Sequence, residues 1–119
     1  MRAFTLDVAK TAGSTEDVAV YQLAGKLSLE TVAGFIPQLR AETARHLILG
    51  MSGARLLDSV GAGALVSLFV SRRNRGRTFA LAALPPQAMA VVTVAGLQKL
   101  LPVETSVEQA TGANPESQS

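Results

Sequence analysis

Asp58 and Ser59 are the residues of this sequence whose types and position most invite a chemical interpretation. They stand at the head of the stretch LLDSVGAGALVSLF, Leu56 to Phe69, which is otherwise apolar and rich in glycine. An acid followed by a hydroxyl in such a place suits four tasks: nucleophilic attack, phosphate binding, acceptance of a phosphate group, or capping of a helix. Each task needs further residues, which the rest of the sequence either supplies or lacks.

A serine nucleophile between a strand and a helix is typical of hydrolases, in which it lies in the motif Gly-x-Ser-x-Gly. Leu57 stands where the first glycine of that motif would be. His46 is the one histidine, and it opens the strand before Ser59, at the end far from the serine, where we expect an edge or surface residue. A catalytic triad therefore lacks its base, and we predict that the protein is not an enzyme.

The segment GAGALV, which begins at Gly61, opens like a dinucleotide-binding fingerprint, but Val66 takes the place of the third glycine and no acid ends the next strand. No lysine follows a glycine-rich turn, as a Walker A loop requires. A single histidine, scattered aspartates and the lack of cysteine leave no set of metal ligands. We therefore predict no cofactor and no metal.

Capping accounts for only one of the two polar residues. If Asp58 is the N-cap of the following helix, Ser59 lies in the first helical turn with its hydroxyl turned outward. Unpaired N–H groups and the positive end of the helix dipole stabilise a phosphate group at that place. The residues alone thus favour Ser59 as a phosphorylation site over Ser59 as a nucleophile.

Two glycines follow in the first two turns of the predicted helix, where each costs about 1 kcal/mol relative to alanine. We expect Gly61 and Gly63 to allow close approach, either of a neighbouring strand or of a partner protein's backbone. Val60 lies next to them, and we expect it to be exposed. Together with Asp58 and Ser59, these residues predict a surface for binding a partner.

The elements that position this surface can be predicted from the pattern of apolar residues along 119 residues, a length that suits one domain. Alternation over Arg2–Ala9 and over Val18–Ala24 predicts an antiparallel hairpin, joined by a polar turn at Ala12–Asp17. We expect the domain to occupy residues 1–111. Residues 112–119 have no periodicity and nothing to bury, so we expect a disordered tail there.

Beyond the hairpin, the pattern predicts alternating helices and strands. Ser28 is placed to cap a helix that extends through Ala44, and Pro37 predicts an interruption that divides it into two pieces. The alternation predicts an α/β fold with a mixed sheet flanked by helices, whose sites lie where strands lead into helices. The further predicted elements are a strand at His46–Ser52, a loop at Gly53–Asp58, a helix at Ser59–Asn74, a strand at Thr78–Leu84, a helix at Gln87–Ala95, a short strand within residues 97–104 and a last helical turn at Ser106–Ala110.

The composition is that of a globular domain, with 48% hydrophobic residues, 17% charged residues and a formal net charge of +2. The arginine run Arg72–Arg77 lies at the predicted end of a helix, where cations offset the dipole and stay solvated. No aromatic residues interleave that run, so we expect no direct contact with nucleic acid. No stretch reaches the roughly 18 apolar residues that span a bilayer, and the first ten residues are unlike a signal peptide. We expect a cytoplasmic protein without membrane insertion.

From about Val18 to Gln109, the chain resembles the STAS domains, the fold of bacterial anti-sigma factor antagonists. The segment LLDSVGAGALVSL is similar to the family signature Asp-Ser-Ser-Gly-x-Gly at the start of a helix. Further similar segments occur in the same order and with the same spacing. They are LAGKLS, LILGMSGA, RGRTFALAAL and VAGLQKLLPV.

This resemblance implies a mixed sheet of four or five strands, flanked by about four helices, with no catalysis of its own. In the antagonists, the serine at the position of Ser59 is phosphorylated by the anti-sigma factor, a GHKL-type serine kinase. The unphosphorylated form binds that kinase and frees the sigma factor, which regulates transcription, and phosphorylation blocks the binding. The residues expected to bind the partner are Asp58, Ser59, Val60, Gly61, Gly63 and Ser28.

Three positions depart from the family pattern. Ser28 and Gly50 stand where the family often has aspartate, and Val60 stands where it has a second serine or threonine. Two acids fewer near the acceptor loop would change how a kinase's nucleotide and metal are received. These departures favour an alternative in which the protein is a STAS subunit that is not phosphorylated, part of a lipid-transport ABC complex or of a stress-signalling scaffold. A homodimer is also left open.

Overall fold

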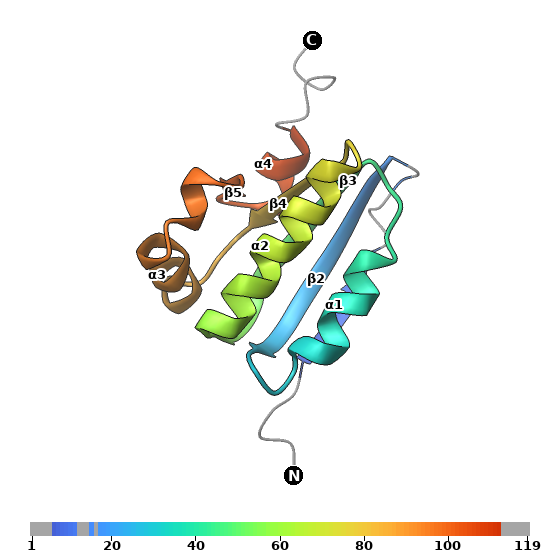
Figure 1. The fold of residues 1–119 in the computed structure, drawn as a ribbon. Helices are drawn as coiled ribbons and strands as arrows, with labels where there is room; N and C mark the ends of the chain where they lie inside the picture. Colours follow the sequence, from blue (N-terminus) through green and yellow to red (C-terminus); the bar gives the residue numbers. More distant parts are fainter. Residues whose placement is uncertain (1–5, 12–14, 16, 113–119) are drawn as a thin grey trace.

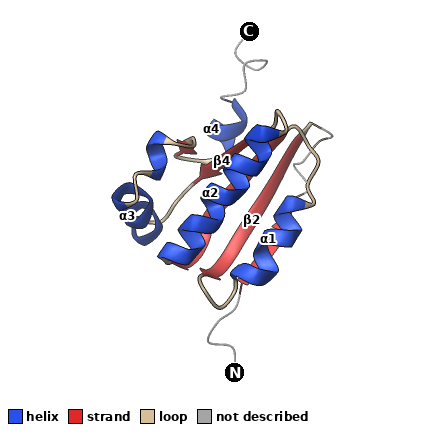
Figure 2. Cartoon of the chain, in the orientation of Figure 1, coloured by secondary structure: helices blue, strands red, loops and turns tan. Residues whose placement is uncertain are grey.

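Within the described residues, a five-stranded mixed sheet forms the centre of the molecule, with helices packed on it (Figure 2). Its strands lie in the order in which they occur along the chain. The computed structural model describes residues 6–11, 15 and 17–112. The first two strands are antiparallel, and every later strand is parallel to the one before it. The strands are β1 (Leu6–Lys10), β2 (Val18–Leu27), β3 (His46–Leu57), β4 (Thr78–Ala82) and β5 (Val103–Glu104).

Helices cover both faces of this sheet. In Figure 1, α1 and α2 lie side by side across the near face, α3 lies next to α2, and α4 packs behind β4. The helices are α1 (Val32–Arg40), α2 (Ser59–Asn74), α3 (Pro86–Val94) and α4 (Val107–Gly112), with a 3₁₀ turn, η1 (Leu97–Lys99), after α3. Over the described residues, this architecture confirms the predicted α/β class, with four to five strands and about four helices.

The core is divided by the sheet into a large and a small part. The large part lies under α1, α2 and α3 and consists mainly of aliphatic side chains. The small part lies under α4 and contains Val20, Ile48 and Ala82. Successive strand residues point to opposite faces, so Ile48 enters the small cluster while Leu47 and Leu49 enter the large one.

β3 is longer than the sequence predicts. The first five residues of the predicted loop Gly53–Asp58 continue the strand and pair with the second half of β2, with Leu57 opposite Leu27. The register of β2 is irregular at two places along this stretch. The loop prediction was wrong because these half-exposed residues are held as a strand by a partner about 30 positions away. The extension carries the chain directly to the start of α2.

α1 begins later than predicted and is not interrupted. Its N-cap is Thr31 and not Ser28, because the N–H groups of Thr31 and Val32 both donate to the carbonyl of Ser28 in a separate turn. Pro37 lies inside the helix, and the Ala41 N–H donates to its carbonyl at 3.1 Å, so the helix continues past it. A proline removes one backbone donor, but the helix ends only at Arg40, three residues after Pro37 and before the predicted end at Ala44.

The arginine run at the end of α2 is only partly solvated, which corrects the prediction for its first residue. Arg72 is 5% exposed. Its guanidinium donates to the carbonyls of Thr78, Glu42 and Ala44, which joins the end of α2 to the first residue of β4 and to the loop between α1 and β3. A planar group with five donors can satisfy three carbonyls at once, and that is why it is buried here. Burial, with the nearby charge of Arg77, lowers the pKa of Arg72 to about 10.

Glu42 lies next to this arginine and is also buried. Its carboxylate accepts from the Tyr21 hydroxyl at 2.7 Å and from the Ala44 N–H at 2.8 Å, and Lys10 Nζ lies 3.1 Å away. Burial raises the pKa of the Glu42 carboxyl, but these three partners outweigh it and lower the pKa to about 2. Burial and the bond to Glu42 raise the pKa of Tyr21 to about 12.

The other predicted elements are present with shifts of a few residues. β4 ends at Ala82 and not at Leu84, and α3 begins at Pro86. Residues 2–5 of the predicted first strand, most of the predicted turn at 12–17 and residues 113–119 of the predicted tail at 112–119 lie outside the described residues. Gly112, the first residue of that predicted tail, is instead the last residue of α4. Among the helices that are described, none has the length and apolar character needed to cross a membrane.

Candidate functional site

Asp58 joins two segments at the start of α2. It is the N-cap residue, and its Oδ1 accepts a hydrogen bond from the Gly61 N–H at 2.8 Å. Its Oδ2 accepts a second one from the Leu29 N–H at 3.1 Å, in the loop between β2 and α1. A cap needs only the first bond. The second bond fixes the β2–α1 loop against the helix, which the sequence did not predict.

Ser59 is the first residue of α2, and it is exposed. Helical bonding begins with the Ala62 N–H, which donates to the Asp58 carbonyl at 2.9 Å. The N–H groups of Ser59 and Val60 therefore have no carbonyl acceptor within the helix. Val60 is 40% exposed beside them. The first turn of α2 thus brings together the exposed hydroxyl of Ser59, the positive end of the helix dipole and the apolar side chain of Val60.

The two glycines of this helix have different surroundings. A β-carbon on Gly61 would collide with the carbonyl oxygen of Leu27 in β2, whereas a β-carbon on Gly63 would have no atom within 4 Å. Gly61 is buried and Gly63 is exposed. Close approach of a neighbouring strand therefore explains Gly61. Gly63 leaves space at the surface, so the alternative of a partner's backbone stays a prediction for that residue alone.

Ser28 lies beside the site but is only 2% exposed. Its hydroxyl donates to Glu30 Oε1 at 2.9 Å, and its N–H donates to the Thr31 hydroxyl at 3.1 Å. Its side chain is therefore not presented to a partner in this structure, because the turn before α1 encloses it. The exposed carboxylate at this place belongs to Glu30, a residue that the sequence did not single out.

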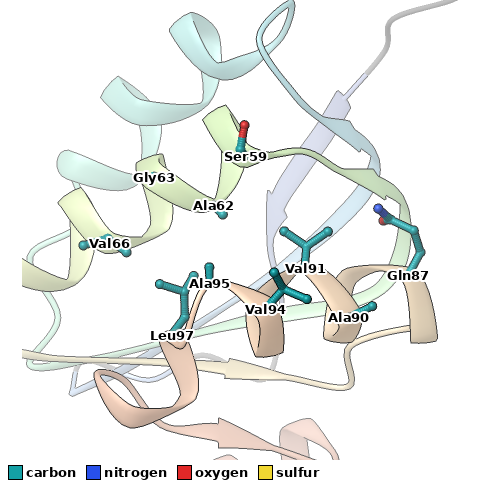
Figure 3. Close-up of a pocket in the computed structure, with 10 residues that line it drawn as sticks. All are labelled: Ser59, Ala62, Gly63, Val66, Gln87, Ala90, Val91, Val94, Ala95 and Leu97. Carbon is teal, nitrogen blue, oxygen red and sulfur yellow. The ribbon is translucent and has the colours of Figure 1, made fainter.

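A groove extends from Ser59 along α2, between α2 and α3 (Figure 3). Its volume is about 570 Å³. The lining is almost entirely apolar and comes from both helices and η1, with Ser59 and Gln87 as its polar members. The apolar side chains and small residues that line it are Ala62, Gly63, Val66, Ala90, Val91, Val94, Ala95 and Leu97.

Large exposed apolar side chains border the same region. Leu29 is 65% exposed and is held at the site through its N–H bond to Asp58. Val94 is 89% exposed at the rim of the groove. Leu29 and Val60 therefore give apolar surface at the Ser59 end of the groove, and Val94 gives it along the α3 side. Exposed apolar side chains gathered around a groove are typical of a surface that binds another protein.

Gln87 connects α3 to the residue before the cap. Its Oε1 accepts from the Leu57 N–H, and its Nε2 donates to the Leu57 carbonyl, both at 2.9 Å. Neither Gln87 nor Leu29 was a candidate from the sequence, because their partners lie about 30 positions away. Each is recognisable only once β2, β3 and α3 are placed together.

The residues considered for a catalytic triad or a metal site do not lie near Ser59. His46 begins β3, at the end of the strand opposite Ser59, and its Nδ1 lies 2.8 Å from the Thr78 hydroxyl. The part of the chain that the structure describes contains no group of three or more metal-ligating side chains. The region around Ser59 is therefore a capped helix start beside an apolar groove.

Known proteins share this architecture. The STAS domain model matches residues 9–110, and no curated protein matches the chain. An anti-sigma factor antagonist from Mycobacterium paratuberculosis superposes with a TM-score of 0.78 at 19% identity, over 90% of this chain and 93% of that one. SpoIIAA, an anti-sigma factor antagonist in its unphosphorylated form, gives 0.73 at 16% identity, over 90% and 95%.

A transporter domain has the same fold. The STAS domain of a SulP transporter from Vibrio cholerae superposes with a TM-score of 0.69 at 23% identity, over 86% of this chain and 84% of that one. At these identities the superpositions establish the fold, which therefore occurs in both antagonists and transporters. Because the family model spans most of the sequence, the chain belongs to the STAS domain family.

Proposed function

We propose that this protein is an anti-sigma factor antagonist that binds an anti-sigma factor serine kinase and is switched by phosphorylation of Ser59. The observation that carries the proposal is that two neighbouring residues at the start of α2 have different roles. Asp58 caps the helix, so the exposed hydroxyl of Ser59 is left for modification. We place this role in the cytoplasm, and we propose that the protein binds and signals without catalysis of its own.

The surroundings of Ser59 support a phosphate-sensitive interface. The unmodified hydroxyl is small and lies beside apolar surface from Val60, Leu29 and the groove. A phosphate would add nearly two negative charges, which the positive end of α2 tolerates in the free protein. Packed against an apolar partner surface, the same charges would lose water without gaining a counter-ion. Phosphorylation would therefore disfavour the complex more than the free protein.

The test is phosphorylation of the full chain. We expect incubation with ATP and the serine kinase encoded beside its gene to add one phosphate, located on Ser59 by mass spectrometry. Ser59→Ala should remain unmodified. Ser67→Ala is the matched control, because Ser67 is an exposed serine of the same helix, and it should be modified at the normal rate. No phosphate, or a phosphate at another position, contradicts the proposal.

A second candidate is a STAS subunit that holds a partner without being phosphorylated. The observation in its favour is the lack of acids at two places. A side chain at Gly50 would collide with the amide of Gln22, and Ser28 is enclosed by its turn. We would then expect Ser59→Ala to keep full partner binding and signalling in cells, and Ser59→Asp to lose partner binding. Such a pair of results would show that function depends on the interface around Ser59 and not on a cycle of phosphorylation. That result would favour the second candidate.

A further inference from the structure

The bond pair between Gln87 and Leu57 lies at a gap in the sheet. β4 pairs with β3 only as far as Gly50, opposite Ala82. Within the described residues, no strand pairs with the Leu57 end of β3 on that side, although β2 pairs with it on the other. The Gln87 amide accepts from the Leu57 N–H and donates to the Leu57 carbonyl, and it thus occupies both backbone groups that a neighbouring strand could bond.

Leu57 directly precedes the capping residue. Its side chain is fully buried, and the next residue, Asp58, holds both the first turn of α2 and the Leu29 loop. A displacement of the Leu57 backbone would therefore move Asp58, and with it the turn that presents Ser59. Gln87 fixes that backbone from α3, the helix that forms the far wall of the groove.

We propose that Gln87 is a positioning residue that couples the position of α3 to the first turn of α2, which carries Ser59. α3 is separated from α2 by the groove along much of its length (Figure 3), so a partner that fills the groove acts on α3 directly. Gln87 transmits the new position of α3 to Leu57, and Leu57 transmits it to the cap. The identity of Ser59 as phosphate acceptor rests on the proposed function, whereas the coupling does not.

Hydrogen exchange of backbone amides in the full chain tests the first link. Gln87→Leu removes both bonds and keeps the side-chain size, and we expect the hydrogen-bonded amides of Asp58, Gly61 and Ala62 to exchange about tenfold faster. Gln87→Glu keeps the acceptor for the Leu57 N–H and loses the donor, so its exchange should be intermediate. The matched control is Gln38→Leu, which removes a helix-to-strand bond from Gln38 Nε2 to the Val8 carbonyl. Unchanged exchange in Gln87→Leu, or equal acceleration by Gln38→Leu, overturns the proposal.

A wedge in the groove tests the second link. Ala90 is exposed on α3 and lines the groove, so Ala90→Trp fills it without entering the core. We expect the wedge to change exchange at the amides of Asp58, Gly61 and Ala62 in the presence of Gln87. In the Gln87→Leu background, at least half of that effect should be lost. Equal effects in both backgrounds contradict the coupling. Neither experiment uses a kinase, so the coupling is tested independently of phosphorylation. It can be confirmed even if Ser59 is not phosphorylated, and it can be contradicted even if Ser59 is phosphorylated.

Discussion

The carbonyl oxygen of Leu27 occupies the space that a side chain on Gly61 would need. The last residue of β2 and the first turn of α2 are thus in direct backbone contact beneath Ser59. This contact determines how deep the start of α2 sits on the sheet, and it distinguishes two glycines that look alike in the sequence.

Alanine at the two glycines should have opposite effects. We expect Gly61→Ala to lower the free energy of unfolding by about 1–3 kcal/mol, because the added methyl group meets backbone that cannot give way. Gly63→Ala has open space and should raise it by up to about 1 kcal/mol, since alanine is the better helix former. Urea denaturation measures both. Equal losses in the two variants would show that helix propensity, and not the contact with Leu27, governs this turn.

Removing the cap should release two segments at once. We expect Asp58→Ala to lower the free energy of unfolding by about 1–2 kcal/mol and to speed amide exchange at both Gly61 and Leu29. Asp58→Ser keeps a short acceptor for the Gly61 N–H but does not reach Leu29. In that variant only the Leu29 amide should exchange faster. Protection of Leu29 in both variants would contradict the bridging role of Asp58.

The buried carboxylate of Glu42 should make stability depend on acid pH. Its pKa is about 2 in the folded protein against an ordinary value of 4.5, so its contribution is complete above pH 4.5 and is lost as the pH falls toward 2. We expect this group to account for about 3 kcal/mol of unfolding free energy over that window. Glu42→Gln should remove that share of the pH dependence. Glu108→Gln, an exposed control on α4, should leave it in place, and the idea fails if the two variants titrate alike.

Ala83, in the loop before α3, has a backbone conformation in the left-handed region. Ala83 has a φ of 60°, a conformation that costs an L-residue about 1–2 kcal/mol. Ala83→Gly should therefore raise the melting temperature, by an amount equivalent to about 0.5–1 kcal/mol after the entropy of glycine is subtracted. Ala80→Gly, in the regular part of β4, should lower it. A loss of stability in both variants would show that the backbone at Ala83 is not strained.

The sequence was sufficient for the parts of the fold and site that depend on local chemistry. Asp58 and Ser59 lie in one continuous segment, so capping rules predicted that one of them caps the helix and that, if Asp58 is the cap, Ser59 lies in the first turn. The strands have clear apolar periodicity, and the order of elements was predicted from it. The arginine run was predicted less well, because nothing local shows that Arg72 turns inward to three carbonyls while Arg73 stays exposed.

Features that depend on distant partners could not be predicted. The end of β3 is a strand because β2 pairs with it, and Leu29 is held beside the cap by its bond to Asp58. Gln87 has no sequence signal that points to Leu57. In each case the decisive contact joins segments whose proximity exists only after the sheet has formed.

The order of the strands bears on how the chain folds. Each strand from β2 onward pairs with the one made just before it, so no strand has to enter between two that are already paired. The sheet can grow at one edge, and loop closure at each step spans only the crossover helix just completed. β5 and α4 can add last to a body that already contains α1, α2 and the Asp58 bridge. A chain emerging from the ribosome would thus complete the start of α2, with Asp58 and Ser59, before the last edge strand of the sheet is added.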